Sequence, residues 1–110
     1  MVVGILQFEL HIPDSMSLKD KRRVVRSVKD RLHNEHMVSI AEVAEQETIN
    51  LAVMGLSCVG VDGKVVGSVL DHVSEKLRSW KGAELGETSR EILTGDMHAY
   101  AQSEDVEDGI

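Results

Sequence analysis

The chain has very few of the residues that carry covalent or stacking chemistry. Its 110 residues include one cysteine, one proline and three aromatic residues. A single cysteine, Cys58, excludes an internal disulfide and a zinc site built from several cysteines. Phe8, Trp80 and Tyr100 are too few and too scattered to form the aromatic platform on which RNA-recognition sheets stack bases.

Targeting and membrane signals are also missing. Residues 1–10 contain no lysine or arginine, which a secretory signal requires before its apolar stretch. No apolar run approaches the roughly 20 residues of a membrane span. We therefore expect a cytoplasmic protein with no membrane partner.

Catalytic and metal-binding patterns are incomplete. His11 could approach Ser15 or Ser17 across a turn, but no third group completes a nucleophilic site. His33 and His36 could hold a metal ion, yet no further ligand is evident. The glycine-rich loops that bind nucleotides are absent. We expect no catalytic residue, no metal and no cofactor, and the chain is interpreted as non-enzymatic.

Charge is unevenly distributed along the chain. There are 12 Lys and Arg against 19 Asp and Glu, a net charge of −7. Residues 94–110 contain five acidic residues and no Lys or Arg, so the remaining 93 residues carry only −2. Within them, residues 19–31 hold seven basic and two acidic residues, a local charge of +5. Such a polarised surface can attract an anionic partner.

The basic segment, SLKDKRRVVRSVKDRL, has the pattern of an amphipathic helix. Ser17 followed by Asp20 resembles a capping box, and Leu18, Val25, Val28 and Leu32 share one side. A basic stripe lies beside them, and Lys21 falls on the apolar side, where its stem can still carry the ammonium to solvent. The predicted anion- or RNA-binding residues are Ser17, Lys19, Lys21, Arg22, Arg23, Arg26 and Lys29.

The other secondary-structure elements are predicted from the spacing of apolar residues along the chain. Residues 2–12 alternate as a strand with one buried face, and residues 37–44 and 83–93 predict weaker strands. Residues 49–59 are apolar throughout, as in a central strand, and a second helix follows the N-cap Asp62 and extends to Trp80. The order βαββαβ predicts an α+β, ferredoxin-like sandwich over residues 1–93. Residues 94–110 are predicted to be an acidic, mobile tail.

Several of these stretches also carry a family resemblance. The first strand, SLKDKRRVVRSVKDRL, VSIAEV and AELGETSREIL resemble the YlxP-like family of small bacterial proteins of unknown function. The resemblance covers roughly residues 1–93 and implies a ferredoxin-like fold without an established activity. The family's genes often lie near translation factors, which implies a translation- or RNA-related setting. No catalytic residue is carried over, and the acidic tail lies outside the pattern.

Two function classes follow. In the first, the basic helix contacts phosphates of structured RNA or the ribosome, with no DNA sequence specificity. The alternative interpretation of the basic stripe is a solvated helix face that has no partner. In the second, the protein is a homo-oligomeric module that binds a small ligand or another protein and no nucleic acid. A homodimer is expected in either class, formed over the open sheet face or along an edge strand. The reason is that apolar residues such as Val3 and Ile5 fall on the sheet face that the helices leave open.

Overall fold

The structure, a computed structural model, describes residues 1–95 and contains six elements. They are β1 (Val2–His11), α1 (Leu18–His36), β2 (Ser39–Ala44), β3 (Leu51–Gly60), α2 (Gly63–Arg78) and β4 (Glu84–Thr94). The four strands form one antiparallel sheet in the order β2-β3-β1-β4. The predicted ferredoxin-like α+β fold is confirmed, with β1 and β3 central and β2 and β4 at the edges.

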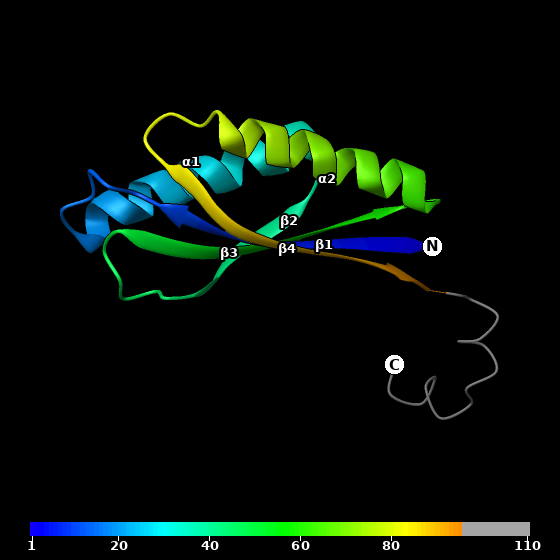
Figure 1. Ribbon diagram of the computed structural model, residues 1–110, viewed down its shortest axis with the longest axis horizontal. Helices are drawn as coiled ribbons and strands as arrows, with labels where there is room; N and C mark the ends of the chain where they lie inside the picture. The colour runs from blue at the N-terminus through cyan, green and yellow to red at the C-terminus, as the bar shows by residue number, and fades with distance from the viewer. Residues whose placement is uncertain (96–110) are drawn as a thin grey trace, which may run out of the picture.

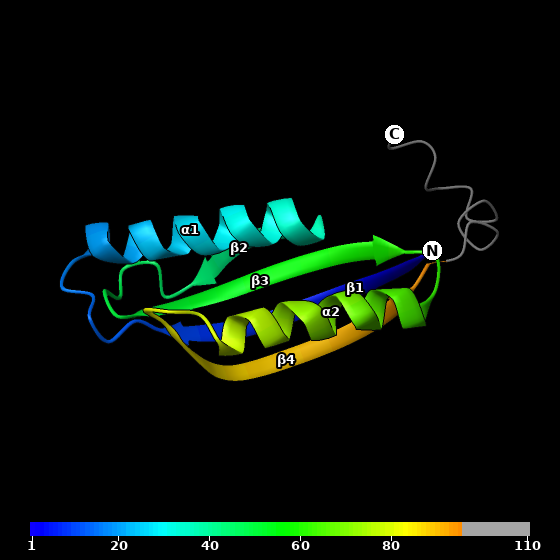
Figure 2. The ribbon, with the colours of Figure 1, turned by 90° about the horizontal axis from the view of Figure 1, so that it is seen from above.

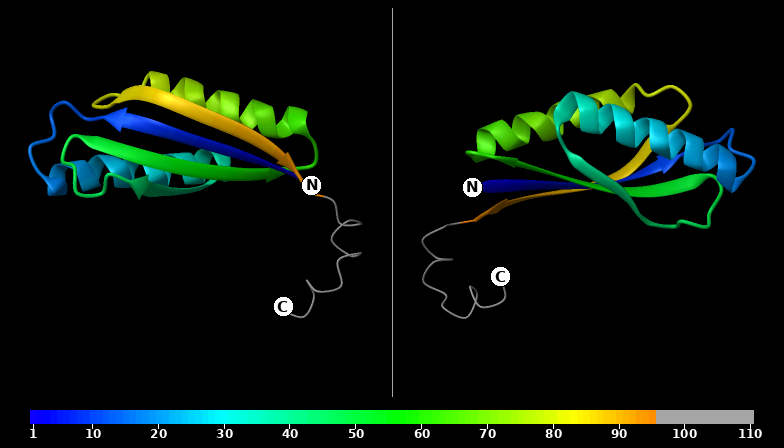
Figure 3. Two further views of the ribbon diagram at one scale, coloured as in Figure 1. Left: turned by 60° about the horizontal axis from the view of Figure 1, so that its bottom comes forward. Right: turned by 180° about the vertical axis from the view of Figure 1, so that it is seen from behind.

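Both helices cover the same face of the sheet (Figure 1). Seen from above, α1 lies on the side of β2 and β3, and α2 lies on the side of β1 and β4 (Figure 2). No helix of residues 1–95 lies on the opposite face of the sheet, so all four strands are visible from that side (Figure 3, left). The fold is therefore a two-layer sandwich with one open sheet face.

The core lies between the helices and the sheet. Alternation along β1 places Leu6, Phe8 and Leu10 in it, with exposed fractions of 2% or less. The register pairs Leu6 with Leu56 and Phe8 with Met54, so the buried sides of the two central strands coincide. The helices contribute their apolar stripes, which are Val25, Val28 and Leu32 from α1 and Val66, Leu70, Val73 and Leu77 from α2.

Element ends differ from the predicted ones by a few residues. Helix α1 extends past the basic segment and stops at His36, because Met37 adopts a left-handed conformation with φ 54° and donates its N–H to the carbonyl of His33. Helix α2 ends at Arg78, so Trp80 follows the helix instead of extending it. None of the helices within residues 1–95 is long and apolar enough to cross a membrane.

Candidate phosphate-binding face of helix α1

The first turn of α1 is fixed by reciprocal capping. The Asp20 N–H donates to Ser17 Oγ at 3.1 Å, and the Asp20 carboxylate accepts the Met16 N–H at 3.0 Å. The buried Ser15 hydroxyl donates to the Ser17 carbonyl at 3.1 Å. The predicted cap is confirmed, and it sets where the basic residues begin. Ser15 and Ser17 therefore act chiefly on the protein's own backbone.

The outer side of α1 carries a group of cations, which we call the basic face. Its four exposed members and the half-buried Lys29 form no ion pair with any other group in residues 1–95. Other basic residues of the same region, such as Arg31 and Lys76, are paired with Glu35. The charge of the basic face is thus available to an external anion. The basic face consists of Lys19, Arg22, Arg23, Arg26 and Lys29.

Lys21 does not belong to this face, and the expectation that it reaches solvent or an RNA phosphate is wrong. Its side chain is fully buried. The ammonium donates to the carbonyls of Glu45, Thr48 and Leu51 at 2.6, 2.7 and 3.0 Å, and it lies 2.8 Å from Glu42 Oε2. Three carbonyls use the three N–H donors, so the carboxylate is held by charge alone. Lys21 ties the β2–β3 loop to α1.

A groove runs between the basic face and the edge strand β2. It has a volume of about 360 Å³. Arg22, Arg26 and Lys29 line its helix side, and Glu42 and Gln46 line the opposite side. The Lys21 contacts hold the loop that carries Gln46, so they also define this wall. The groove places three cations, one turn apart, beside the outer edge of the sheet.

The histidines and serines considered for catalysis are not assembled into a site. His11 Nε2 lies 3.7 Å from Glu9 Oε1 and makes no hydrogen bond to Ser15 or Ser17 within the described residues. His33 Nδ1 lies 2.9 Å from the Val38 carbonyl, which commits that nitrogen to the end of α1. Among residues 1–95 no group of three or more possible metal ligands is brought together.

Two titratable groups have shifted pKa values. A hydrogen bond from Lys76, with its charge and that of Arg31, lowers the pKa of Glu35. Burial raises the pKa of the Cys58 thiol, so it stays protonated and acts as a small apolar side chain. Neither group lies on the basic face.

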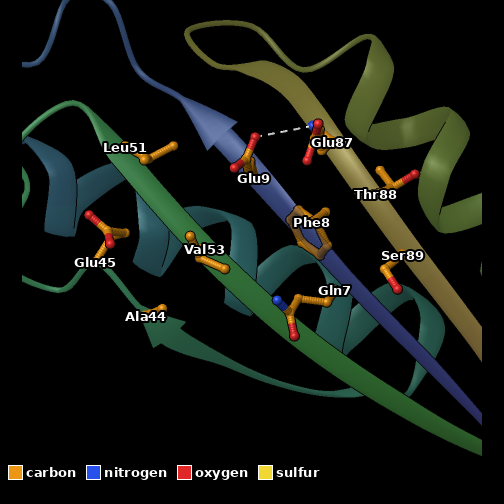
Figure 4. A pocket seen from close by; sticks show the side chains of 10 residues that line it. All are labelled: Gln7, Phe8, Glu9, Ala44, Glu45, Leu51, Val53, Glu87, Thr88 and Ser89. Carbon is orange, nitrogen blue, oxygen red and sulfur yellow. Dashed lines mark hydrogen bonds between the residues drawn. The ribbon is translucent and has the colours of Figure 1, made fainter.

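The open sheet face is the second distinctive surface. A hollow of about 370 Å³ lies across β1, β3 and β4 (Figure 4). Val53 lies on its floor, and Glu9, Glu45 and Glu87 stand around it. Here the Glu87 N–H donates to Glu9 Oε1 at 3.3 Å. This end of the open face is therefore acidic, in contrast to the outer side of α1.

At the other end of the open face, three apolar residues form a row across the sheet. The register pairs Val3 with Val59 and with Leu93. Val59 is 66% exposed and Leu93 is 44% exposed. On β3 the structure places Val53 and Val59 on this face and buries Met54 and Leu56 under the helices.

Two features of the candidate site were not predicted from the sequence. The groove requires β2 to lie beside α1, which no local pattern reports. The role of Lys21 also depends on a contact 24 to 30 residues away. The one local signal for this role was the position of Lys21 on the apolar side of the helix, between Leu18 and Val25 in the apolar stripe.

The fold and the basic helix define a small ferredoxin-like α+β protein. The chain belongs to a family described as "Protein of unknown function (DUF503)", whose model matches residues 3–90. It is similar to "Uncharacterized protein YlxP" of Bacillus subtilis (strain 168), with 34% identity over 58 residues, 53% of this chain. The match spans 63% of that protein, less than two thirds of its length. The family resemblance inferred from the sequence is confirmed.

One solved structure bears on the fold alone. The "De novo designed protein Foldit4" superposes with a TM-score of 0.50 at 9% identity, covering 87% of this chain and 100% of the designed one. A designed sequence with the same arrangement indicates that the sandwich itself dictates no function. The function must therefore be argued from the side chains of this chain.

Proposed function

We propose that the basic face of α1 contacts the phosphate backbone of structured RNA, such as a ribosomal segment. The observation that carries this proposal is the set of five cations on one side of the helix that have no ion pair within residues 1–95. Unpaired cations concentrated on one face of an acidic chain favour a polyanion over a small neutral ligand.

The spacing of the basic face suits successive phosphates. From Lys19 to Lys29 the helix rises about 15 Å at 1.5 Å per residue. Because that length exceeds the separation of neighbouring phosphates on a strand, several can be contacted at once. Phe8 is buried under α1 and α2, and Trp80 holds Arg31 at 4.7 Å from its ring centre, so neither presents a stacking platform. Contacts would therefore be to phosphates and only weakly sequence-selective.

Ribosome co-sedimentation at two salt concentrations tests the proposal. Four neutralised phosphates predict an affinity loss of about 100-fold between about 50 and about 200 mM salt, because each contact releases counterions. Arg22→Gln/Arg26→Gln should pellet poorly at low salt with unchanged circular dichroism. Lys64→Gln/Lys81→Gln removes the same charge from exposed positions outside the basic face and should pellet like wild type. Equal pelleting of the two double variants, or no pelleting of wild type at low salt, would mean that the face is only solvated.

A homodimer through the open sheet face is the second candidate, favoured by the row of half-buried Val3 and exposed Val59 and Leu93. A second copy is the simplest cover for such a row. Sedimentation equilibrium at micromolar concentration should show a dimer that Val3→Glu weakens. Val61→Glu makes the same change at a loop position and serves as the control. A monomer at all concentrations would remove this candidate. Thermal shift against a metabolite panel would separate a small-ligand module from an RNA-binding one.

A further inference from the structure

The groove beside α1 combines two properties that an extended acidic peptide would satisfy together. On one side Arg22, Arg26 and Lys29 lack ion-pair partners within the described residues. On the other side β2 pairs only with β3 within residues 1–95, so its outer backbone groups have no strand partner in that part of the chain. An exposed sheet edge accepts an added strand, and adjacent cations select the charge of its side chains.

The chain itself contains a segment of matching charge. Residues 104–108 read EDVED, with four carboxylates in five positions, and they lie beyond the described residues. No other five-residue stretch of the chain has as many acidic residues. We propose that this acidic segment binds in cis in the groove between α1 and β2.

The tether is long enough for this contact. Gly95 donates its N–H to the Met1 carbonyl at 2.8 Å, so the segment starts from the corner where β1 begins. Ala41 of β2 is opposite Gly55, which is opposite Gln7 of β1. The groove is therefore about six residues along the sheet and three strands across it, about 25 Å away at standard strand spacings. Eight residues lie between Gly95 and Glu104, and the nine Cα–Cα steps can span about 30 Å.

The direction and the length of the acidic segment also agree with those of the groove. Helix α1 begins at the end of the sheet where β1 ends and runs back toward the start of β1 (Figure 2). A segment arriving from Gly95 therefore meets Lys29 first, then Arg26 and Arg22. These three cations span about 10 Å of helix. Residues 104–108 in extended form cover about 13 Å. The segment would run parallel to β2, since β2 and β1 are both antiparallel to β3.

A bound acidic segment would regulate the site. It would occupy Arg22, Arg26 and Lys29, which are also the residues proposed to meet RNA phosphates, and would compete most strongly with weak, non-specific RNA. This consequence rests on the proposed function, whereas the docking itself does not.

The test uses the full chain with Glu104→Gln, Asp105→Asn, Glu107→Gln and Asp108→Asn. At low salt, this variant should differ from wild type in the ¹⁵N–¹H signals of Ala41–Val43 and in the side-chain Nε signals of Arg22 and Arg26. The difference should shrink at about 0.5 M salt, where charges are screened within a few ångströms. It should not depend on protein concentration, because the contact is within one chain.

A matched control neutralises four exposed carboxylates that make no ion pair among residues 1–95: Asp14→Asn, Glu84→Gln, Glu87→Gln and Glu91→Gln. It makes the same change in net charge and should leave the groove signals unchanged. Equal shifts in both variants, no shifts in either, or shifts that grow with protein concentration would overturn docking in cis. RNA affinity is measured on the same proteins, and the tail variant should bind several-fold more tightly than the control. Groove shifts without any RNA binding would uphold the docking and reject the proposed function.

Discussion

Replacing Lys21 by methionine should strongly destabilise the protein. Methionine keeps the unbranched stem and its packing but removes the ammonium. The Glu42 carboxylate, whose side chain is 16% exposed, then loses its counter-charge at 2.8 Å, and three carbonyls lose a donor. Removing one partner of a buried ion pair costs about 3–5 kcal/mol. That is a large fraction of the about 5–15 kcal/mol that stabilises a typical domain.

Part of this cost should be recoverable by removing the carboxylate too. Two of the carbonyls, from Glu45 and Thr48, lie in the loop and can turn to water once released, which limits their share. The larger share comes from Glu42. The double variant Lys21→Met/Glu42→Gln should therefore be more stable than the sum of the two single changes by at least about 1 kcal/mol.

Urea unfolding followed by circular dichroism measures these differences. With a urea dependence of about 1–3 kcal/mol per molar, Lys21→Met should lower the midpoint by about 1 M or more. Lys19→Met makes the same substitution two residues earlier at an exposed position and should change stability by no more than about 0.5 kcal/mol. If the two variants unfold at the same urea concentration, the Lys21 ammonium does not hold the loop and the reasoning fails.

Three further predictions follow from the packing and the titratable groups. The Glu35 carboxyl should titrate below its ordinary pKa, and Lys76→Gln should raise the titration midpoint seen by NMR. The ion pair stabilises the fold at pH values above the pKa of Glu35 in the unfolded state, and this stabilisation is lost as the pH falls through the pKa of Glu35 in the folded state. The Cys58 thiol should react with a disulfide reagent only at the rate of unfolding, since burial raises its pKa; fast reaction of the native protein would show it to be accessible. Gly4→Ala should cost about 1–3 kcal/mol, because a Cβ there would collide with Val66. The same chemical-denaturation assay should show part of that loss restored by Val66→Ala.

The elements that sequence reasoning predicted well are those with strong local signals. The Ser17 cap, the alternation through Leu6, Phe8 and Leu10, and the doubly apolar β3 each depend on residues close together in the chain. Strand order then followed from the general handedness of crossover connections. Helix ends were less predictable, because Met37 closes α1 with a positive φ that its residue type does not favour.

The candidate site was only partly predictable. Spacing alone placed Lys19, Arg22, Arg26 and Lys29 on one face, and the structure agrees. Spacing also placed Lys21 on the apolar side, but local rules offered only solvent as a partner for its charge. Its actual partners are two carbonyls of the β2–β3 loop, the carbonyl of Leu51 in β3 and the Glu42 carboxylate. No side-chain pattern marks a carbonyl that is turned toward the interior. Such contacts become visible only when the tertiary structure is known.

Lys21 also bears on how the loop acquires its shape. Glu45 holds a left-handed conformation with φ 57°, which costs a non-glycine residue about 1–2 kcal/mol, and its carbonyl is the nearest of the three to the ammonium. The three carbonyls thus surround the Lys21 ammonium, as the oxygen atoms of a chelator surround an alkali-metal ion. In a chain with alanine at position 21 the three carbonyls would have no donor, and those of Glu45 and Thr48 would turn to water. Potassium or a small alkylamine added to that chain should then restore order to the loop. The variant would therefore depend on dissolved cations, whereas the native protein has the Lys21 ammonium in their place.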